Sequence, residues 1–87
     1  MVDFHKNFDK QFQKLSEKIQ GKVEVALERF KRNPLDPVLR NHALRGAMKG
    51  KRAISAMGNV RIIFREFDSY TLVLMLDVGS HPHVYGN

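Results

Sequence analysis

Apolar side chains in the first third of the chain recur at the spacing of an α-helix. Residues three or four positions apart fall on one stripe of a helix, and this is the spacing of Phe4, Phe8, Phe12, Leu15 and Ile19. A second stripe follows at Ile19, Val23, Ala26, Leu27 and Phe30. Ser16 and Glu17 are suited to begin a new helix, because the hydroxyl can accept from free backbone N–H groups and the carboxylate lies near the positive end of the dipole. Asn33-Pro34 ends it, since proline disfavours helical geometry at the preceding residue. We therefore predict two helices packed as a hairpin.

The last third has the composition of strands. Residues 60–67 are rich in β-branched and aromatic side chains, and residues 70–78 are apolar on both faces, as in a central strand. Weaker candidates are residues 2–4, 51–57 and 83–85. We place turns at Gly58-Asn59 and Asp68-Ser69, a strand break at Gly79-Ser80, and a connecting segment over residues 34–50. Helices followed by an antiparallel sheet predict an α+β fold, with residues 1–87 as one domain.

Side chains in residues 60–67 alternate between two faces of the predicted strand. Val60, Ile62 and Phe64 point one way, whereas Arg61, Ile63 and Arg65 point the other. If the helices cover the first face, the second is an apolar floor that carries two arginines. That surface could bind phosphate, or the arginines could merely cover exposed sheet with their aliphatic stems.

Charge and composition indicate which kinds of partner and site the chain could have. Fifteen Lys and Arg side chains stand against nine Asp and Glu, and a small domain with a net charge of +6 commonly meets a polyanion. Basic small proteins also arise for solubility alone. The chain has no cysteine, so it offers neither a disulfide nor a thiolate zinc site. We see no signal-like run at the N-terminus, and the longest apolar run, residues 71–76, is too short for a membrane span. A cytoplasmic protein is expected.

Histidines are the side chains best suited to proton transfer near neutral pH. His5 lies among lysines, His42 lies in the basic connecting segment, and His81 and His83 follow the last strong strand. In RNA, the 2′-hydroxyl can attack the neighbouring phosphate if a base takes its proton, an acid protonates the leaving oxygen and cations stabilise the phosphorane. Histidine, tyrosine, arginine and lysine can supply all of this without a metal or another cofactor.

Two other readings of the histidines stay open. A lone histidine is usually structural rather than chemical. A zinc site is also conceivable, because His81 and His83 would share a face of an extended strand and His42 could supply a third nitrogen. However, Pro82 lies between the first two, and Asp77 is the only nearby carboxylate in sequence.

Three segments together resemble the RelE/ParE toxin superfamily, and within it the YafQ-type mRNA interferases. They are the string from Asn41 to Gly50 followed by Arg52, the strand start from Asn59 to Phe64, and Gly79-Ser80-His81 with Val84-Tyr85-Gly86. The resemblance extends over essentially the whole chain. It implies two helices against a curved antiparallel sheet whose concave face takes RNA, metal-independent cleavage of mRNA on the ribosome, and neutralisation by a cognate antitoxin.

The resemblance also implies site residues. His42 and His81 match the catalytic histidines, Tyr85 matches an aromatic position near the scissile phosphate, and Arg61 matches a strand arginine that stabilises the transition state. The expected RNA-binding side chains are Arg45, Lys49, Lys51, Arg52, Arg65 and His83. Two positions depart from the YafQ pattern: Ser55 stands where a histidine is expected, and Asn59 where an aspartate is.

Two alternatives stay open. One is a ParE-like inhibitor of DNA gyrase, although that branch usually lacks the paired histidines present in this chain. The other is an RNA-binding relative that has lost catalysis. For the antitoxin, we expect an acidic, amphipathic segment that folds onto the face carrying Arg61, Ile63 and Arg65 and blocks the site.

Overall fold

The computed structural model describes residues 1–85 as helices over a five-stranded sheet. The elements, in chain order, are β1 (Val2–Phe4), α1 (Lys6–Gln13), α2 (Glu17–Arg32), η1 (Pro37–Leu39), β2 (His42–Ala43), η2 (Gly46–Met48), β3 (Arg52–Met57), β4 (Val60–Phe67), β5 (Leu72–Ser80) and α3 (His81–Tyr85). The strand order is β1-β5-β4-β3-β2. The predicted α+β class is confirmed. No helix in the described part of the chain is both long and apolar enough to cross a membrane.

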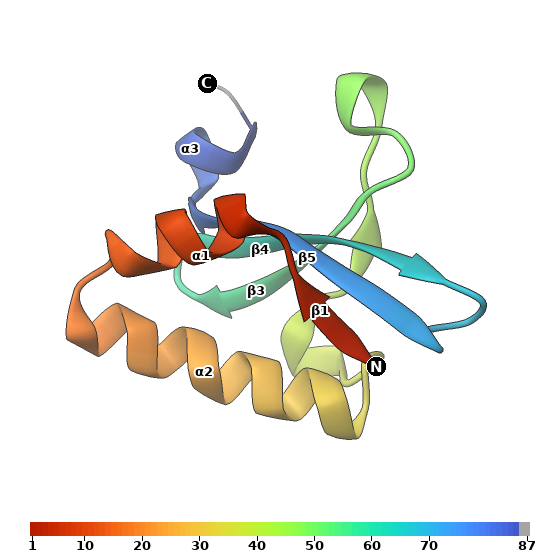
Figure 1. Ribbon diagram of the computed structural model, residues 1–87, viewed down its shortest axis with the longest axis horizontal. Coiled ribbons are helices and arrows are strands. Elements are labelled where there is room, and N and C mark those ends of the chain that lie inside the picture. Colours follow the sequence, from red (N-terminus) through yellow and green to blue (C-terminus); the bar gives the residue numbers. More distant parts are fainter. Residues whose placement is uncertain (86–87) are drawn as a thin grey trace.

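Helices α1 and α2 form where the apolar stripes predicted them. The Ser16 hydroxyl accepts from the backbone N–H of Ile19 at 3.3 Å, which satisfies a donor that the first turn of α2 leaves free. Asn33 follows the last helical residue in an extended conformation, as its neighbour Pro34 requires. Helix α1 packs chiefly against β5, whereas α2 packs against β3 (Figure 1).

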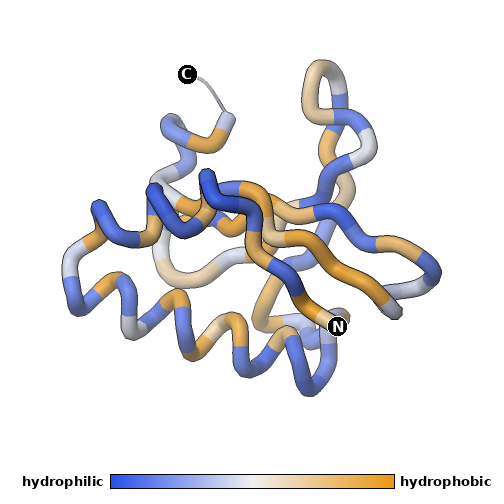
Figure 2. The backbone as a smooth tube through the Cα atoms, in the orientation of Figure 1, coloured by the Kyte–Doolittle hydropathy of each residue, from blue (hydrophilic) through white to orange (hydrophobic). Residues whose placement is uncertain are grey.

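The main core lies between these helices and one face of the sheet. Phe30 of α2 meets Phe64 of β4 edge to face, with ring centroids 5.0 Å apart. Around them lie further buried side chains from α1, α2 and the strands: Phe8, Val23, Leu27, Ile54, Ile62, Val73 and Met75. A second, smaller cluster of Ala53, Ile63 and Val84 lies on the opposite face. The predicted alternation along β4 is therefore confirmed, and Figure 2 shows the apolar strands running through the middle of the molecule.

The sheet differs from the sequence prediction at its edges. It is mixed rather than wholly antiparallel, because β1 pairs in parallel with β5 while the other neighbours are antiparallel. The connecting segment also holds some structure, since it contains the short strand β2 and the turns η1 and η2.

The end of the chain was predicted wrongly. Gly79-Ser80 does not break β5, because Gly79 and Ser80 still pair with Arg61 and Val60 of β4. Residues 83–85 form part of helix α3 rather than a strand. One helical turn lets Val84 reach the second face of the sheet, where it is buried with Ala53 and Ile63. Burial of an apolar side chain outweighs the weak strand propensity of so short a segment.

Candidate functional site

The sheet face opposite α2 brings together residues from four strands. Paired residues on neighbouring strands share a face of a sheet. The register pairs His42 with Ala53, Ala53 with Ile63, and Ile63 with Asp77. A second row joins Ser55, Arg61 and Gly79. Helix α3 and the loop that holds η2 rise on this side of the sheet (Figure 1). We call it the second face.

His81 and Tyr85 form a pair at one border of the second face. They are four residues apart in α3, and their ring centroids are 4.3 Å apart at an interplanar angle of 66°. His81 is exposed, whereas Tyr85 is half-buried and packs against the cluster of Ala53, Ile63 and Val84. The tyrosine is thus fixed by the sheet, and the histidine is held against it with its ring open to solvent.

His42 lies at the other border, on the edge strand β2. Its Nδ1 is 2.8 Å from the backbone oxygen of Arg40. A carbonyl oxygen can only accept, so Nδ1 carries the hydrogen and Nε2 of the neutral ring is an acceptor. The side chain is exposed, and this acceptor is available to a ligand.

Arg61 lies beside the turn between β3 and β4. Its Nη1 donates to the backbone oxygens of Gly58 at 2.8 Å and Val60 at 3.1 Å. A guanidinium has five N–H donors, so these two contacts orient the group and leave donors for an anion. Ser55, its partner on β3, occupies the same face of the sheet, where the YafQ pattern led us to look for a histidine.

The His83 side chain contacts β5 as well as solvent. Its Nε2 lies 3.3 Å from Oδ1 of Asp77, and its ring covers Gly79 so closely that a Cβ on that glycine would come within 2.6 Å of Cδ2. These contacts anchor α3 to β5. His83 is also exposed, so the expected contact with RNA stays a prediction beside this positioning role. Asp77 and Gly79 were missed as site residues, although Gly79 belongs to the Gly-Ser-His motif.

Arg52, another expected RNA-binding residue, lies on the other face of the sheet. It pairs with Phe64, so it points to the helix side of the sheet, away from the second face. Its Nε donates to Oδ1 of Asn41 at 2.9 Å, and Nδ2 of Asn41 donates to the backbone oxygen of Pro34 and to the Tyr70 hydroxyl, each at 3.0 Å. Arg52 and Asn41 therefore fix the segment that presents His42, and Arg52 is not one of the cations of the second face.

Replacing Asn41 by alanine should lower the free energy of unfolding by about 1–3 kcal/mol, because a partly buried donor on Arg52 and acceptors on Pro34 and Tyr70 lose their partner. Urea denaturation followed by circular dichroism measures the change. Gln13→Ala is a matched control: Gln13 is exposed at the end of α1, and we expect a change within about 0.5 kcal/mol. Equal stabilities of the two variants would contradict the role given to Asn41.

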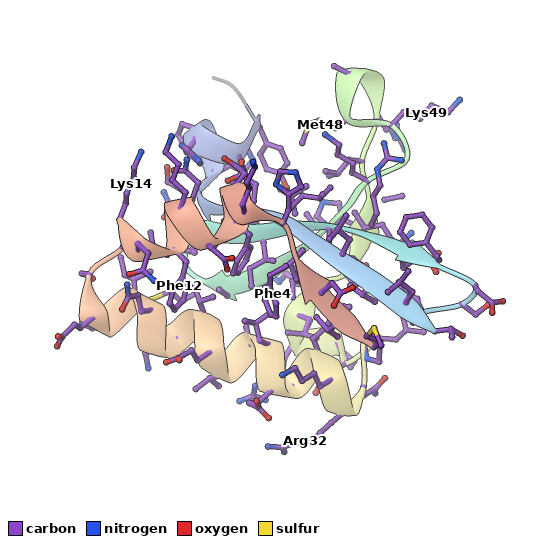
Figure 3. All side chains as sticks on the ribbon, in the orientation of Figure 1. Phe4, Phe12, Lys14, Arg32, Met48 and Lys49 are labelled. Atoms are coloured by element: carbon purple, nitrogen blue, oxygen red, sulfur yellow. The ribbon has the colours of Figure 1, made fainter. Side chains whose placement is uncertain are left out.

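The other expected RNA-binding cations border the second face at the η2 loop. Arg45 and Lys49 flank η2, Lys51 precedes β3, and the guanidinium of Arg65 lies beside Gly50. Figure 3 shows Lys49 on this projecting loop next to Met48. Within residues 1–85 the one ion pair of a Lys or Arg side chain joins Lys31 and Glu28, so the loop cations have no carboxylate partner there.

The described residues contain no group of three or more His, Cys, Asp and Glu side chains that could hold a metal ion. The three-histidine zinc site considered for His42, His81 and His83 therefore has no geometric basis in residues 1–85. The two histidines of α3 already have other neighbours, Tyr85 and Asp77.

The chain matches no protein-family model and no curated protein sequence, but its fold has clear structural neighbours. YafQ from E. coli superposes with a TM-score of 0.82 at 19% identity, over 99% of this chain and 98% of that one. The RelBE2 toxin-antitoxin complex from Mycobacterium tuberculosis gives 0.74 at 28% identity, over 92% and 95%. The YoeB/ParE toxin from Agrobacterium tumefaciens gives 0.74 at 16% identity, over 92% and 96%. The fold of this chain is therefore that of the RelE/ParE toxin superfamily, and its architecture is YafQ-like.

Proposed function

We propose that this chain is the toxin of a type II toxin-antitoxin system, an endoribonuclease that cleaves mRNA on the ribosome. The observation that carries the proposal is the gathering of His42, Arg61, His81 and Tyr85 on the face of the sheet away from α2. These are the side chains that the family resemblance assigns to catalysis. The structural neighbours are toxins, which supports the same class of function.

The two histidines lie at opposite borders of the second face, which leaves room for a phosphate between them. His42 is on β2 and α3 lies over β4 and β5, so at least two strand spacings, roughly 10 Å, separate the two borders. A base and an acid that each come within about 3 Å of opposite oxygens of one phosphate need a separation of this order. Between them, Ala53 and Ile63 are buried beneath Val84 and Tyr85, so apolar side chains fill the middle of the second face.

We assign the base to His42, whose Nε2 is a free acceptor, and the acid to His81. His42 takes the proton of the 2′-hydroxyl as the oxygen forms its bond to phosphorus. The bond from phosphorus to the 5′-oxygen breaks, and the leaving oxygen receives its proton from His81. The products are a cyclic 2′,3′-phosphate and a free 5′-hydroxyl. Tyr85 holds the His81 ring, and Arg61 neutralises the charge of the phosphorane. Arg45, Lys49, Lys51 and Arg65 hold the RNA backbone.

Cleavage of a single-stranded RNA should persist in excess EDTA, because side chains supply each proton and each positive charge that the reaction uses. The same RNA with a 2′-deoxy sugar at the scissile position should stay intact, because the attacking hydroxyl is gone. Gel analysis of end-labelled RNA checks both results, with the cyclic phosphate identified by mass. Activity that EDTA abolishes and zinc restores would contradict this chemistry.

Expression of the chain alone should arrest growth, and co-expression of the antitoxin should restore it. Growth arrest with intact mRNA and inhibited gyrase supercoiling would replace the nuclease by a gyrase-binding toxin. RNA binding without cleavage or growth arrest would identify a relative that has lost catalysis.

A further inference from the structure

An exposed apolar patch lies at the tip of the hairpin that joins β4 to β5. Phe67 and Leu72 pair across the two strands and are 44% and 37% exposed. Side chains two residues apart in a strand point to the same face, so Phe67 follows Ile63 and Arg65 on the second face. Leu74 pairs with Arg65 and is half-buried on the same face. We call Phe67, Leu72 and Leu74 the hairpin patch.

The turn of this hairpin is strained and is held by several hydrogen bonds. Asp68, Ser69 and Tyr70 have φ values of 53°, 51° and 70°, in the left-handed region that residues other than glycine seldom adopt. The Thr71 hydroxyl donates to the backbone oxygen of Asp68 at 2.7 Å, and the Glu66 carboxylate accepts from the backbone N–H of Tyr70 at 3.0 Å. Backbone strain persists where surrounding contacts fix it, and it is common at binding sites. The hairpin patch is therefore presented on a fixed turn.

The charges around the hairpin patch favour an anion on one side of it. Arg65 lies beside the patch with its guanidinium near Gly50, and Lys51 directly precedes β3, the next strand of the sheet. Neither cation has a carboxylate partner within residues 1–85. On the outer side, Asp3 of β1 pairs with Leu74 and would repel a phosphate. A ligand that suits the patch therefore carries its anionic groups toward Arg65 and an apolar group over the tip.

We propose that the hairpin patch binds a nucleobase of single-stranded RNA, which stacks on the ring of Phe67 while Arg65 binds the neighbouring phosphate. A base offers the flat apolar surface, and the sugar-phosphate backbone offers the negative charge. The identification of this RNA as the substrate rests on the proposed function. Phe67 lies four residues along β4 from Ile63, or about 13 Å, so the patch holds the RNA strand beyond the reacting phosphate. Because every base has a π-face, the patch positions RNA without reading its sequence.

A second copy of this chain fits the patch less well than RNA does. In a symmetric dimer formed through the tip, Arg65 and Lys51 of each copy would come close to the same cations of the other copy and repel them. RNA also explains the place of the patch in the fold. The hairpin lies at the end of β4 away from α3, so the patch continues the face on which the proposed catalytic residues gather (Figure 1).

Binding of an uncleavable oligonucleotide, measured by fluorescence anisotropy, tests the stacking contact. The probe is 2′-O-methyl oligoadenylate, in which the attacking hydroxyl is blocked, and the matched probe has the same backbone with abasic residues. Phe67→Ala should weaken binding of the oligoadenylate about tenfold, the scale of one lost stack, and leave binding of the abasic backbone unchanged. Arg65→Gln should weaken binding of both probes and reduce its dependence on salt. Leu35→Ala, at an apolar position before η1 that is 64% exposed, is the control and should bind like the parent.

A tryptophan at the patch reports where the bases bind. The chain has no tryptophan, so Phe67→Trp adds a single one and keeps an aromatic face. Oligoadenylate, but not the abasic backbone, should quench its fluorescence, whereas Leu35→Trp should keep its emission with both probes. Equal affinities of Phe67→Ala and Leu35→Ala for oligoadenylate, or a parent dimer that Phe67→Ala dissociates without loss of RNA affinity, would overturn the proposal. Because no readout is cleavage, a chain that binds as expected but does not cut RNA contradicts only the nuclease assignment.

Discussion

Replacing His81 by alanine should slow RNA cleavage by about a hundredfold or more, the usual effect of losing an acid or base group. His81 is exposed and contacts the edge of the Tyr85 ring, so its removal should leave the fold and its stability nearly unchanged. Single-turnover cleavage of end-labelled RNA measures the chemical step directly. RNA binding should survive, because Arg45, Lys49 and Arg65 still hold the backbone.

A second histidine provides the control for this experiment. His5 is exposed before α1, where its Nδ1 accepts from the backbone N–H of Asn7. His5→Asn retains a side chain that can cap the helix, and we expect parental cleavage. A His81→Ala protein that cleaves RNA or arrests growth like the parent would remove His81 from the mechanism, whereas loss of activity in both variants would indicate a general defect.

The elements that could be predicted from the sequence are those whose hydrophobic pattern matches the face that they bury in the fold. In β4, the alternation of Ile62, Ile63 and Phe64 between two faces could be read directly, because side chains in a strand point alternately to either side. Helix α2 likewise begins after Ser16 and ends before Asn33, where hydrogen-bond chemistry and Pro34 set its limits.

Features that depend on long-range packing could not be predicted in this way. Residues 83–85 have the propensity of a strand, but burial of Val84 against Ala53 and Ile63 determines a helical turn. Arg52 belongs to a basic segment in sequence, yet the register of β3 turns it toward Asn41 on the helix side. Burial of Ile54 in the main core fixes this face, but Ala53, Ser55 and Ala56 are small, so the sequence marks the buried face of β3 only weakly.

The close packing at Gly79 could not be predicted from the sequence either, because it involves the ring of His83 on α3. A Cβ at Gly79 would lie 2.6 Å from Cδ2, 3.1 Å from Cγ and 3.4 Å from Cβ of His83. The distance to Cβ is ordinary van der Waals contact, so the clash is with the imidazole ring, which must turn away from Asp77 or push α3 off the strand. Either change loosens the anchor of α3, so Gly79→Ala should displace α3, and with it His81 and Tyr85.

We expect Gly79→Ala to slow RNA cleavage by about a hundredfold, because a displacement of about 1 Å is enough to misplace an acid group relative to the phosphate. The free energy of unfolding of Gly79→Ala should fall by about 1–3 kcal/mol, as at other overpacked sites, and the protein should stay folded. Gly21→Ala is the matched control. A Cβ there meets nothing within 4 Å, and the position lies inside α2, so this variant should gain up to about 1 kcal/mol and keep parental cleavage.

The double variant Gly79→Ala, His83→Ala shows whether the clash with the imidazole, and not damage to the strand itself, causes the loss of cleavage. Removing the imidazole relieves the clash, so α3 can return to the sheet through Val84 although the contact with Asp77 is lost. Cleavage by the double variant should therefore exceed that of Gly79→Ala at least tenfold while staying below that of the parent. If Gly79→Ala cleaves like Gly21→Ala, the close packing of His83 on β5 does not position the site. If the double variant is no better than Gly79→Ala although both are folded, the defect lies in the strand and not in the placement of α3.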